Sequence, residues 1–323
     1  MSVKVKSVLE REPAMLRDTY VKTLMELTEQ DPRHVALDAD LSSSLGIKPF
    51  VAAYPDRFFN CGICEANMVG VAAGLASMGF MPWAHTFGIF ASRRVADQVF
   101  MSVAYGGQNV RIVGTDPGVT AAFNGGTHMP FEDMGMLRTI PQMTLVEPTD
   151  SVQLAAAMRQ MAQKPGAYYL RLQRKQAVSV FEEGSDFQIG KGIVLQDGTD
   201  VTLIASGILV APALEAAKML AEKGISVRVV NLHTWKPLDE ALVETCARET
   251  GAIVTCENHN TLCGLGSAVC ETVAQTCPVP VMRIGSGDQF GEVGPEDYLR
   301  GRFHMNAIDI AVAAEKAMAK KKK

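Results

Sequence analysis

The chain has 323 residues, of which 47% are hydrophobic and 20% charged, so it is long enough for about two domains with large buried layers and is neither disordered nor collagen-like. Its 31 basic and 35 acidic side chains give a net charge of −4, which argues against nucleic acid as a partner, and its apolar runs are too short to cross a membrane. Seven cysteines without a dense framework, and an N-terminus without an apolar signal core, predict a cytoplasmic protein with reduced thiols.

Short apolar strands alternate with helices through the first half of the chain. A helix is predicted over 15–29, then the strand HVALDAD, a small and apolar helix over 65–78, the strand MPWAHTF and a helix over 87–105. The strand VRIVGTD follows and leads into a Gly-rich loop over 117–127; after it come the strand TLVEPTD, a helix over 150–163 and the strand AYYLRLQ. This alternation predicts a parallel sheet covered on both faces.

The segment 176–198 breaks the pattern and indicates a linker that could contain one edge strand. The alternation then restarts with VTLIASG, ISVRVVN, AIVTCE and VPVMRIG as strands, and with helices over 209–223, 238–249, 265–275 and about 306–319. We therefore predict an α/β chain of two parallel-sheet, three-layer domains, 1–178 and 199–323, joined by a linker over 179–198. The Lys-rich tail is expected to be a solvated helix end.

Glu65 is the most informative single residue. It is the only formally charged side chain between Phe58 and Ser92, and a small, apolar helix follows it. A carboxylate in such surroundings is costly to desolvate without a partner, and groups of this kind often have functional roles. Two interpretations remain open at this point: a functional carboxylate, or a buried glutamate that caps a helix start or pairs with a distant arginine.

Three further groups could form a ligand site. Phe87 and Phe90 follow a strand end, where open α/β sheets bind ligands and where aromatic faces can hold a flat heterocycle. His128 closes the loop TDPGVTAAFNGGTH, from which it could reach a substrate. Arg171 and Arg174 end the strand AYYLRLQRK and suit an anion. Taken singly, each group has a structural alternative: core aromatic residues, a histidine at a helix start, and surface ion pairs.

Three weaker motifs carry less information. CGIC at 61–64 has the spacing of a redox motif, but no second cysteine pair or nearby histidine completes a metal site in the sequence. GLGSAV at 264–269 begins like a dinucleotide fingerprint but has Val269 in place of the third glycine, which favours a tight helix entry. His259 in CENHN could cap a strand end or meet a subunit neighbour.

The chain resembles the transketolase family in motifs that occur in the family's order and spacing: GICEANMVGVAAGLA, HTFGIFASRRVADQV, GTDPGVTAAFNGGTHMPFEDMGMLRTIPQMTLVEPTD, LRLQRKQ, NLHTWKPLD and VTCENHNTLCGLGSAV. The resemblance runs from about residue 12 to about residue 318. It covers the pyrimidine-binding domain and the small C-terminal domain, which together form the C-terminal half of a full transketolase. It therefore implies one subunit of a split, two-gene transketolase.

The resemblance implies roles for individual residues. Glu65 aligns with the glutamate that hydrogen-bonds the aminopyrimidine of thiamine diphosphate, where apolar surroundings favour the protonated acid. Phe90 aligns with the aromatic residue that stacks on the pyrimidine, and Phe87 with a nearby pocket aromatic. His128 aligns with the substrate-contacting histidine beside the reacting carbonyl. Glu65 and His128 are thus the expected catalytic residues.

The resemblance also implies contacts to the far end of the substrate. Ser44, Arg17 and Arg174 align with the family's contacts to the sugar phosphate. Two substrate positions depart from the family: its histidine twelve residues before His128 is Asp116 here, and its usual acid four residues before is Asn124. An aspartate repels a phosphate unless a cation intervenes, so the resemblance leaves the terminal group of the sugar open.

One part of the family's site is missing from the sequence, namely the GDG and the following asparagine that hold the diphosphate and a divalent metal. We therefore expect Mg²⁺ or Ca²⁺ and the diphosphate to be held mainly by a partner subunit with the N-terminal domain, in an assembly of two copies of each chain. This chain is expected to provide no metal ligand.

The expected reaction transfers a two-carbon ketol unit from a ketose, expected to be phosphorylated, to an aldose. Alternatives are the β subunit of a 2-oxoacid dehydrogenase, a 1-deoxyxylulose-5-phosphate synthase-like subunit, and a non-catalytic scaffold. The loop NGGTHMPFEDMGMLRTIP follows the transketolase pattern rather than the dehydrogenase one, and intact Glu65, Phe90 and His128 argue against a scaffold.

Overall fold

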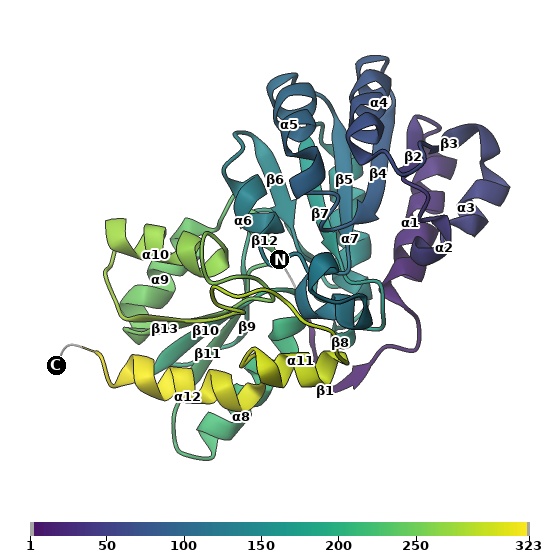
Figure 1. Cartoon of the computed structure of the whole chain (residues 1–323). Helices are drawn as coiled ribbons and strands as arrows, with labels where there is room; N and C mark the ends of the chain where they lie inside the picture. Colours follow the sequence, from purple (N-terminus) through teal and green to yellow (C-terminus); the bar gives the residue numbers. More distant parts are fainter. Residues whose placement is uncertain (1–2, 322–323) are drawn as a thin grey trace.

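The computed structural model describes residues 3–321 and contains two large sheets, each covered by helices on both faces (Figure 1). The predicted α/β class is confirmed. Among the helices of residues 3–321, none combines the length and the apolarity that a membrane span requires.

The first sheet has seven strands in the order β12-β6-β7-β5-β4-β2-β3. Its strands are β2 (His34–Asp38), β3 (Phe58–Asn60), β4 (Met81–Phe87), β5 (Val110–Thr115), β6 (Met143–Val146), β7 (Ala167–Leu172) and β12 (Thr234–Lys236). All neighbours are parallel except β12, which runs antiparallel to β6. Every residue of β2, β5 and β7 is buried, as expected for parallel strands with helices on both faces.

The two faces of this sheet are covered by different helices. One face packs against α4 (Glu65–Ser77), α6 (Asp133–Arg138) and the segment 95–104. The other packs against α1 (Leu16–Gln30), α3 (Lys48–Ala53) and α7 (Ser151–Gln163). Alternate residues of β2 divide accordingly, with Val35 and Leu37 on the α4 face and Ala36 on the α1 face.

The second sheet has five strands in the order β14-β13-β10-β11-β9, all parallel except β9. The strands are β9 (Ile193–Gln196), β10 (Val201–Ala205), β11 (Val227–Asn231), β13 (Ile253–Cys256) and β14 (Val281–Ile284). One face packs against α8 (Val210–Ala221) and α12 (Ala307–Met318), and the other against α9 (Glu240–Thr250) and α10 (Leu265–Gln275). Each sheet is therefore the middle of three layers.

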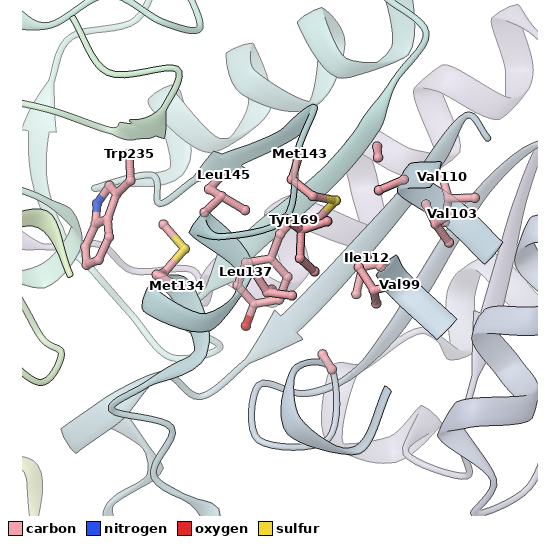
Figure 2. Close-up of a cluster of buried hydrophobic side chains, with 14 of the residues drawn as sticks. Val99, Val103, Val110, Ile112, Met134, Leu137, Met143, Leu145, Tyr169 and Trp235 are labelled. Atoms are coloured by element: carbon pink, nitrogen blue, oxygen red, sulfur yellow. The ribbon is translucent and has the colours of Figure 1, made fainter. Parts of the chain in front are cut away.

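A single apolar cluster connects the two sheets. In Figure 2 it extends from Val99 and Val110 past Leu137 and Leu145 to Trp235, which lies on β12. Strand β12 comes from the second half of the chain but completes the first sheet. The sequence did not predict this crossing, because three residues carry too little periodicity to show which sheet they join.

The main error in the predicted elements is the helix over 87–105. The chain instead turns over 88–92 and then forms a 3-10 turn (Arg93–Val95), the short α5 (Ala96–Gln98) and a π-helical segment (Val99–Tyr105). The turn follows from crowding at Gly88, whose N–H donates to the carbonyl of Thr115 and where a Cβ would lie 2.9 Å from Pro130. A continuous helix from residue 87 would have no room there.

Several short elements had no sequence signal. They are β1 (Val5–Arg11), which pairs antiparallel with β8 (Val178–Phe181), and the helices α2 (Ser42–Leu45) and α11 (Glu296–Arg302). Strands β8 and β9 both lie largely within the predicted linker over 179–198. The Lys-rich tail follows α12, and its last two lysines lie outside the described residues.

Candidate active site

Three neighbouring strands bring predicted site residues to one edge of the first sheet. Phe87 is the last residue of β4, Asp116 follows β5, and Arg174 lies two residues beyond β7. Strand β5 lies between the other two, with Phe87 opposite Thr115 and Thr115 opposite Leu172. The carboxyl edge of parallel strands is where open α/β sheets bind ligands.

Glu65 is the first residue of α4 and is 2% exposed. Its Oε2 accepts a hydrogen bond of 2.8 Å from Nη1 of Arg94, and the same guanidinium lies 4.0 Å from the centroid of the Phe90 ring. The carboxylate therefore has a cationic partner 29 residues along the chain, as one of the two open interpretations required. Arg94 was not a predicted site residue, although Arg93 and Arg94 are the first charges after the uncharged stretch around Glu65.

His128 lies beside both predicted aromatic residues. Its ring centroid is 5.8 Å from that of Phe87 and 5.5 Å from that of Phe90, both in edge-on geometry. Nδ1 of His128 is 2.9 Å from the hydroxyl of Thr127, and the imidazole is partly exposed. Phe87 and Phe90 are themselves partly exposed, with ring centroids 6.2 Å apart, so they are not part of the buried core.

A pair of arginines forms the far end of the cluster. The Nε of Arg174 donates to Oδ1 of Asp116 at 2.8 Å, and its Nη2 donates to Oδ2. The carbonyl of Ser44 accepts from Nη1 of Arg174 at 2.9 Å and from Nη1 of Arg17 at 2.8 Å. The guanidinium of Arg174 also lies 5.0 Å from the centroid of the Phe87 ring. Ser44 thus takes part through its backbone oxygen.

These contacts form one continuous line. It runs from Glu65 through Arg94 to the two phenylalanines and the imidazole, and from there to the arginine pair and Asp116. The structure therefore brings together the predicted residues Glu65, Phe87, Phe90, His128, Arg174, Asp116, Ser44 and Arg17. Asn124 is exposed on the loop before His128 and makes no side-chain hydrogen bond among the described residues.

The start of α2, the short helix that carries the Ser44 carbonyl, is anchored by Asp38 at the end of β2. The Asp38 carboxylate accepts hydrogen bonds from the Leu41 N–H and from the Ser42 hydroxyl, and Nε2 of His85 lies 3.3 Å from its Oδ1. Burial acts to raise the pKa of Asp38, but these partners lower it overall. Asp38 belongs to the motif DADLSSSLG, but the sequence does not show that its side chain is buried beside His85.

The loop that carries His128 is held by the second half of the chain. Asn258 accepts from the Val119 N–H at 3.0 Å and donates to the carbonyl of Pro117 at 2.8 Å. Gly126 lies against Gly291 so closely that a Cβ at Gly126 would be 2.1 Å from the Gly291 carbonyl oxygen. Neither contact could be predicted, because each joins residues more than 130 positions apart.

Arg171 differs from Arg174 and corrects the prediction that both suit an anion. Its side chain is fully buried and contacts Asp133 through Nε at 2.9 Å and Nη2 at 3.0 Å, and Glu147 through Nη1 at 2.6 Å. The Nη2 group also donates to the carbonyls of Pro130 and Asn258. Burial acts to lower the pKa of Arg171, but the two carboxylates raise it overall. Arg171 is a structural residue that ties the His128 loop to both halves of the chain.

The motif GLGSAV at 264–269 forms the start of α10, which agrees with the predicted tight helix entry. The Glu257 carboxylate accepts from the N–H groups of Leu265 and Gly266, where a bound phosphate would sit in a nucleotide site, and a Cβ at Gly264 would lie 2.0 Å from its Oε2. Burial raises the pKa of Glu257 to about 7, although these N–H groups act to lower it. His259 is buried and accepts from the Gly135 N–H, so it does not face a subunit neighbour.

The cysteines of CGIC are free thiols, with Cys64 exposed and Cys61 partly buried, and burial raises the pKa of Cys61. Within residues 3–321, no group of three or more His, Cys, Asp or Glu side chains is arranged to hold a metal ion.

Comparison with known proteins shows two matching family models. Residues 12–178 match the transketolase pyrimidine-binding domain, and residues 190–310 match the transketolase C-terminal domain. The chain is 51% identical over 306 residues to the 6-deoxy-6-sulfo-D-fructose transketolase subunit SqwH of Clostridium sp. (strain MSTE9), covering 95% of each chain. It is 38% identical over 274 residues to an apulose-4-phosphate transketolase subunit of Phocaeicola vulgatus, covering 84% of this chain and 88% of that one.

Other matches show which part of a longer protein the chain corresponds to. It is 38% identical to 1-deoxy-D-xylulose-5-phosphate synthase 1 of Geobacter sulfurreducens, covering 93% of this chain and 47% of that enzyme. Among solved structures, a split gene transketolase described as an inactive beta4 tetramer has 40% identity and a TM-score of 0.89, covering 96% of this chain and all of that one.

Proposed function

The chain belongs to the transketolase family, and we propose that it is the subunit that supplies the aminopyrimidine half of a thiamine diphosphate site. With its partner subunit it would transfer a two-carbon ketol unit from a ketose to an aldose. The observation that carries the proposal is the unbroken line of contacts from Glu65 to Arg174 at the carboxyl edge of the first sheet.

The residues at the Glu65 end fit an aminopyrimidine. A flat, cationic guanidinium already lies on the Phe90 ring while it donates a hydrogen bond to Glu65. These residues therefore suit a planar group that stacks on an aromatic face and directs a donor at a carboxyl group. The Arg94 side chain is 46% exposed, so its movement toward solvent would leave the Phe90 ring and the Glu65 carboxyl free for such a group. When bound, the cofactor supplies the electron sink that cleavage next to a ketose carbonyl requires.

Each residue along the line would then have its own task. Glu65 would hold a hydrogen bond to the ring of the cofactor, and Phe90 would stack against that ring. Because the Thr127 hydroxyl contacts Nδ1 of His128, Nε2 is the nitrogen that would exchange a proton with a substrate oxygen. Phe87, which lies beside His128, would exclude water from the reacting atoms.

The arginine pair would bind the terminal group of the sugar. Arg174 and Arg17 share the Ser44 carbonyl, so both guanidinium groups face the same small volume. Asn124 lies before His128 on the same loop and would contact a hydroxyl of the sugar. The relatives' names leave two terminal groups open for this chain, since one specifies a sulfonated ketose and the other a phosphorylated one.

The partner subunit would dock on an uncharged face of α4. Its exposed residues are Asn67, Gly70, Gly74 and Ser77, and the exposed Ile63 and Met78 flank the helix. Exposed apolar residues beside a charge-free helix are typical of a protein interface. We propose that the partner holds the diphosphate and Mg²⁺, that the assembly contains two copies of each chain, and that the enzyme works in the cytoplasm.

Reconstitution tests this function directly. The purified chain alone should transfer no ketol unit with thiamine diphosphate and Mg²⁺, and addition of a partner chain with the diphosphate-binding domain should restore transfer. Glu65→Gln, which keeps the shape of the side chain, should lower kcat at least about 100-fold in the complex. Glu29→Gln, on the exposed side of α1, is the matched control.

The same assay separates the alternatives. Full activity of the isolated chain would refute the half-site. Release of CO₂ from pyruvate in the presence of glyceraldehyde 3-phosphate would favour a synthase, and reduction of an acceptor by a 2-oxoacid would favour a dehydrogenase subunit.

A further inference from the structure

We propose that Asp116 sets the charge of the sugar's terminal group, so that the site prefers a singly charged sulfonate to a doubly charged phosphate. This inference rests on the proposed function and concerns the far end of the same site. It starts from Asp116, a predicted substrate position whose buried carboxylate pairs with Arg174.

Asp116 accepts hydrogen bonds from two N–H donors of Arg174, which are then not available to a ligand. Its carboxylate is 3% exposed and accepts from both Nε and Nη2 in a fork, and the Ser44 carbonyl accepts from Nη1. A guanidinium has five N–H donors, so two remain for a ligand. The charge of Arg174 is also compensated, because a paired carboxylate with little access to water is screened weakly.

Arg17 is the remaining source of positive charge. Its Nη1 donates to the Ser44 carbonyl, and no group among residues 3–321 accepts from its Nε. Asp18 lies 3.8 Å from that Nε but is 58% exposed, so solvent screens its charge. Lys175 is exposed, and solvent screens its charge in the same way. The two arginines and Asp116 therefore sum to one positive charge.

One positive charge matches a sulfonate better than a phosphate monoester. A sulfonate carries a single negative charge at every pH at which the protein is folded. A phosphate monoester has a second pKa near 6 and carries a charge of almost −2 above neutral pH. The second charge would have to lie beside the Asp116 carboxylate without a second cation to balance it, and like charges in a shielded site repel strongly.

The backbone at residue 116 allows an isosteric test. Asp116 has a φ of 56°, in the left-handed region, and its N–H donates to the Leu172 carbonyl. Asparagine tolerates this conformation as well as aspartate does. Asp116→Asn therefore keeps the turn and one acceptor for Arg174 while it removes the negative charge.

The experiment compares 6-deoxy-6-sulfofructose, fructose 6-phosphate and fructose as donors for the reconstituted two-subunit enzyme. At pH 8 the wild type should use the sulfonated ketose at least 10-fold better in kcat/KM than the other two. Below pH 6, where the phosphate becomes singly charged, its disadvantage should shrink. Asp116→Asn should raise the ratio of phosphate to sulfonate at least 10-fold, and Asp18→Asn, the matched control, should change that ratio less than about 2-fold.

Calorimetric binding of the same three sugars to the complex decides the charge preference even if turnover is absent, so failure of the proposed function is distinguishable from failure of this inference. Equal or tighter binding of fructose 6-phosphate or fructose by the wild type would overturn the inference. An unchanged ratio in Asp116→Asn would overturn it as well.

Discussion

Arg171 in β7 and Arg174 just after it are only three residues apart, yet the same substitution should have different consequences at each. In Arg171→Lys, an ammonium with three donors replaces a guanidinium that makes five contacts within hydrogen-bond distance in a closed interior. In Arg174→Lys, the lysine can still pair with Asp116, and water can reach the site because the side chain is 16% exposed.

The magnitude follows from the acceptors left without a donor. At least two of the five contacts are lost at Arg171, and each unsatisfied buried group costs about 1–3 kcal/mol, which gives roughly 2–6 kcal/mol. At about 2–4 °C per kcal/mol, Tm should fall by roughly 4–24 °C. Arg174→Lys should cost less, about 1 kcal/mol, because the lysine keeps the ion pair with Asp116 and loses only hydrogen bonds that water can replace at the partly exposed side chain.

Thermal unfolding of the isolated chain and kinetics of the reconstituted enzyme give the two readouts. Arg174→Lys should raise KM for an anionic donor at least 10-fold with a small change in Tm, because a lysine cannot offer the same fork to the terminal group. Arg171→Lys should show the large fall in Tm. Equal falls in Tm, or a wild-type Tm for Arg171→Lys, would refute the division of roles between these arginines.

Two further predictions concern the interface and pH. Gly74→Leu should leave the chain's own Tm unchanged or slightly higher, since nothing lies within 4 Å of a Cβ there, but should weaken association with the partner in size-exclusion chromatography; undiminished assembly would contradict the docking face. Burial lowers the pKa of His233 to about 4 from an ordinary value near 6.5, so the unfolded state binds more protons between these values and stability is lost as pH falls through this window. Urea titrations of the wild type and of His233→Leu measure the free energy of unfolding at each pH. In the variant this free energy should fall less steeply toward low pH, by up to about 1.4 kcal/mol per pH unit, and equal slopes in the two proteins would contradict the prediction.

Much of the fold could be predicted because its strands are short, apolar and separated by clear turns. The strand MPWAHTF begins and ends where β4 does, and the helix predicted over 150–163 differs from α7 by one residue. Parallel strands that are buried on both faces give continuous apolar runs, which can be recognised in the sequence without knowledge of their neighbours. The helix over 87–105 failed because its geometry depends on the close approach of Gly88 to another strand, which periodicity cannot reveal.

The sequence could name candidate site residues one by one, but it could not name the contacts that support them. The resemblance named Glu65, Phe90 and His128 because their motifs are local. The pairing of Asp116 with Arg174 joins positions 58 residues apart, and it decides whether the aspartate opposes or complements an anion. The sequence raised the expectation of a charge conflict at Asp116, and the structure adds that Arg174 pairs with this carboxylate.

The partner of Glu65 could be predicted in part from the sequence. A buried carboxylate in an uncharged stretch requires a cation or a donor, and the first charges after that stretch are Arg93 and Arg94. Arg93 pairs with Glu132 at 2.9 Å, which leaves Arg94 for Glu65. The choice is set by the turn over 88–92, because it places one guanidinium on the Phe90 ring and directs the other toward the His128 loop. The uncharged sequence around Glu65 therefore predicts that the carboxylate has a partner. Which arginine is the partner depends on the turn over 88–92, which packs against Thr115 at the end of β5.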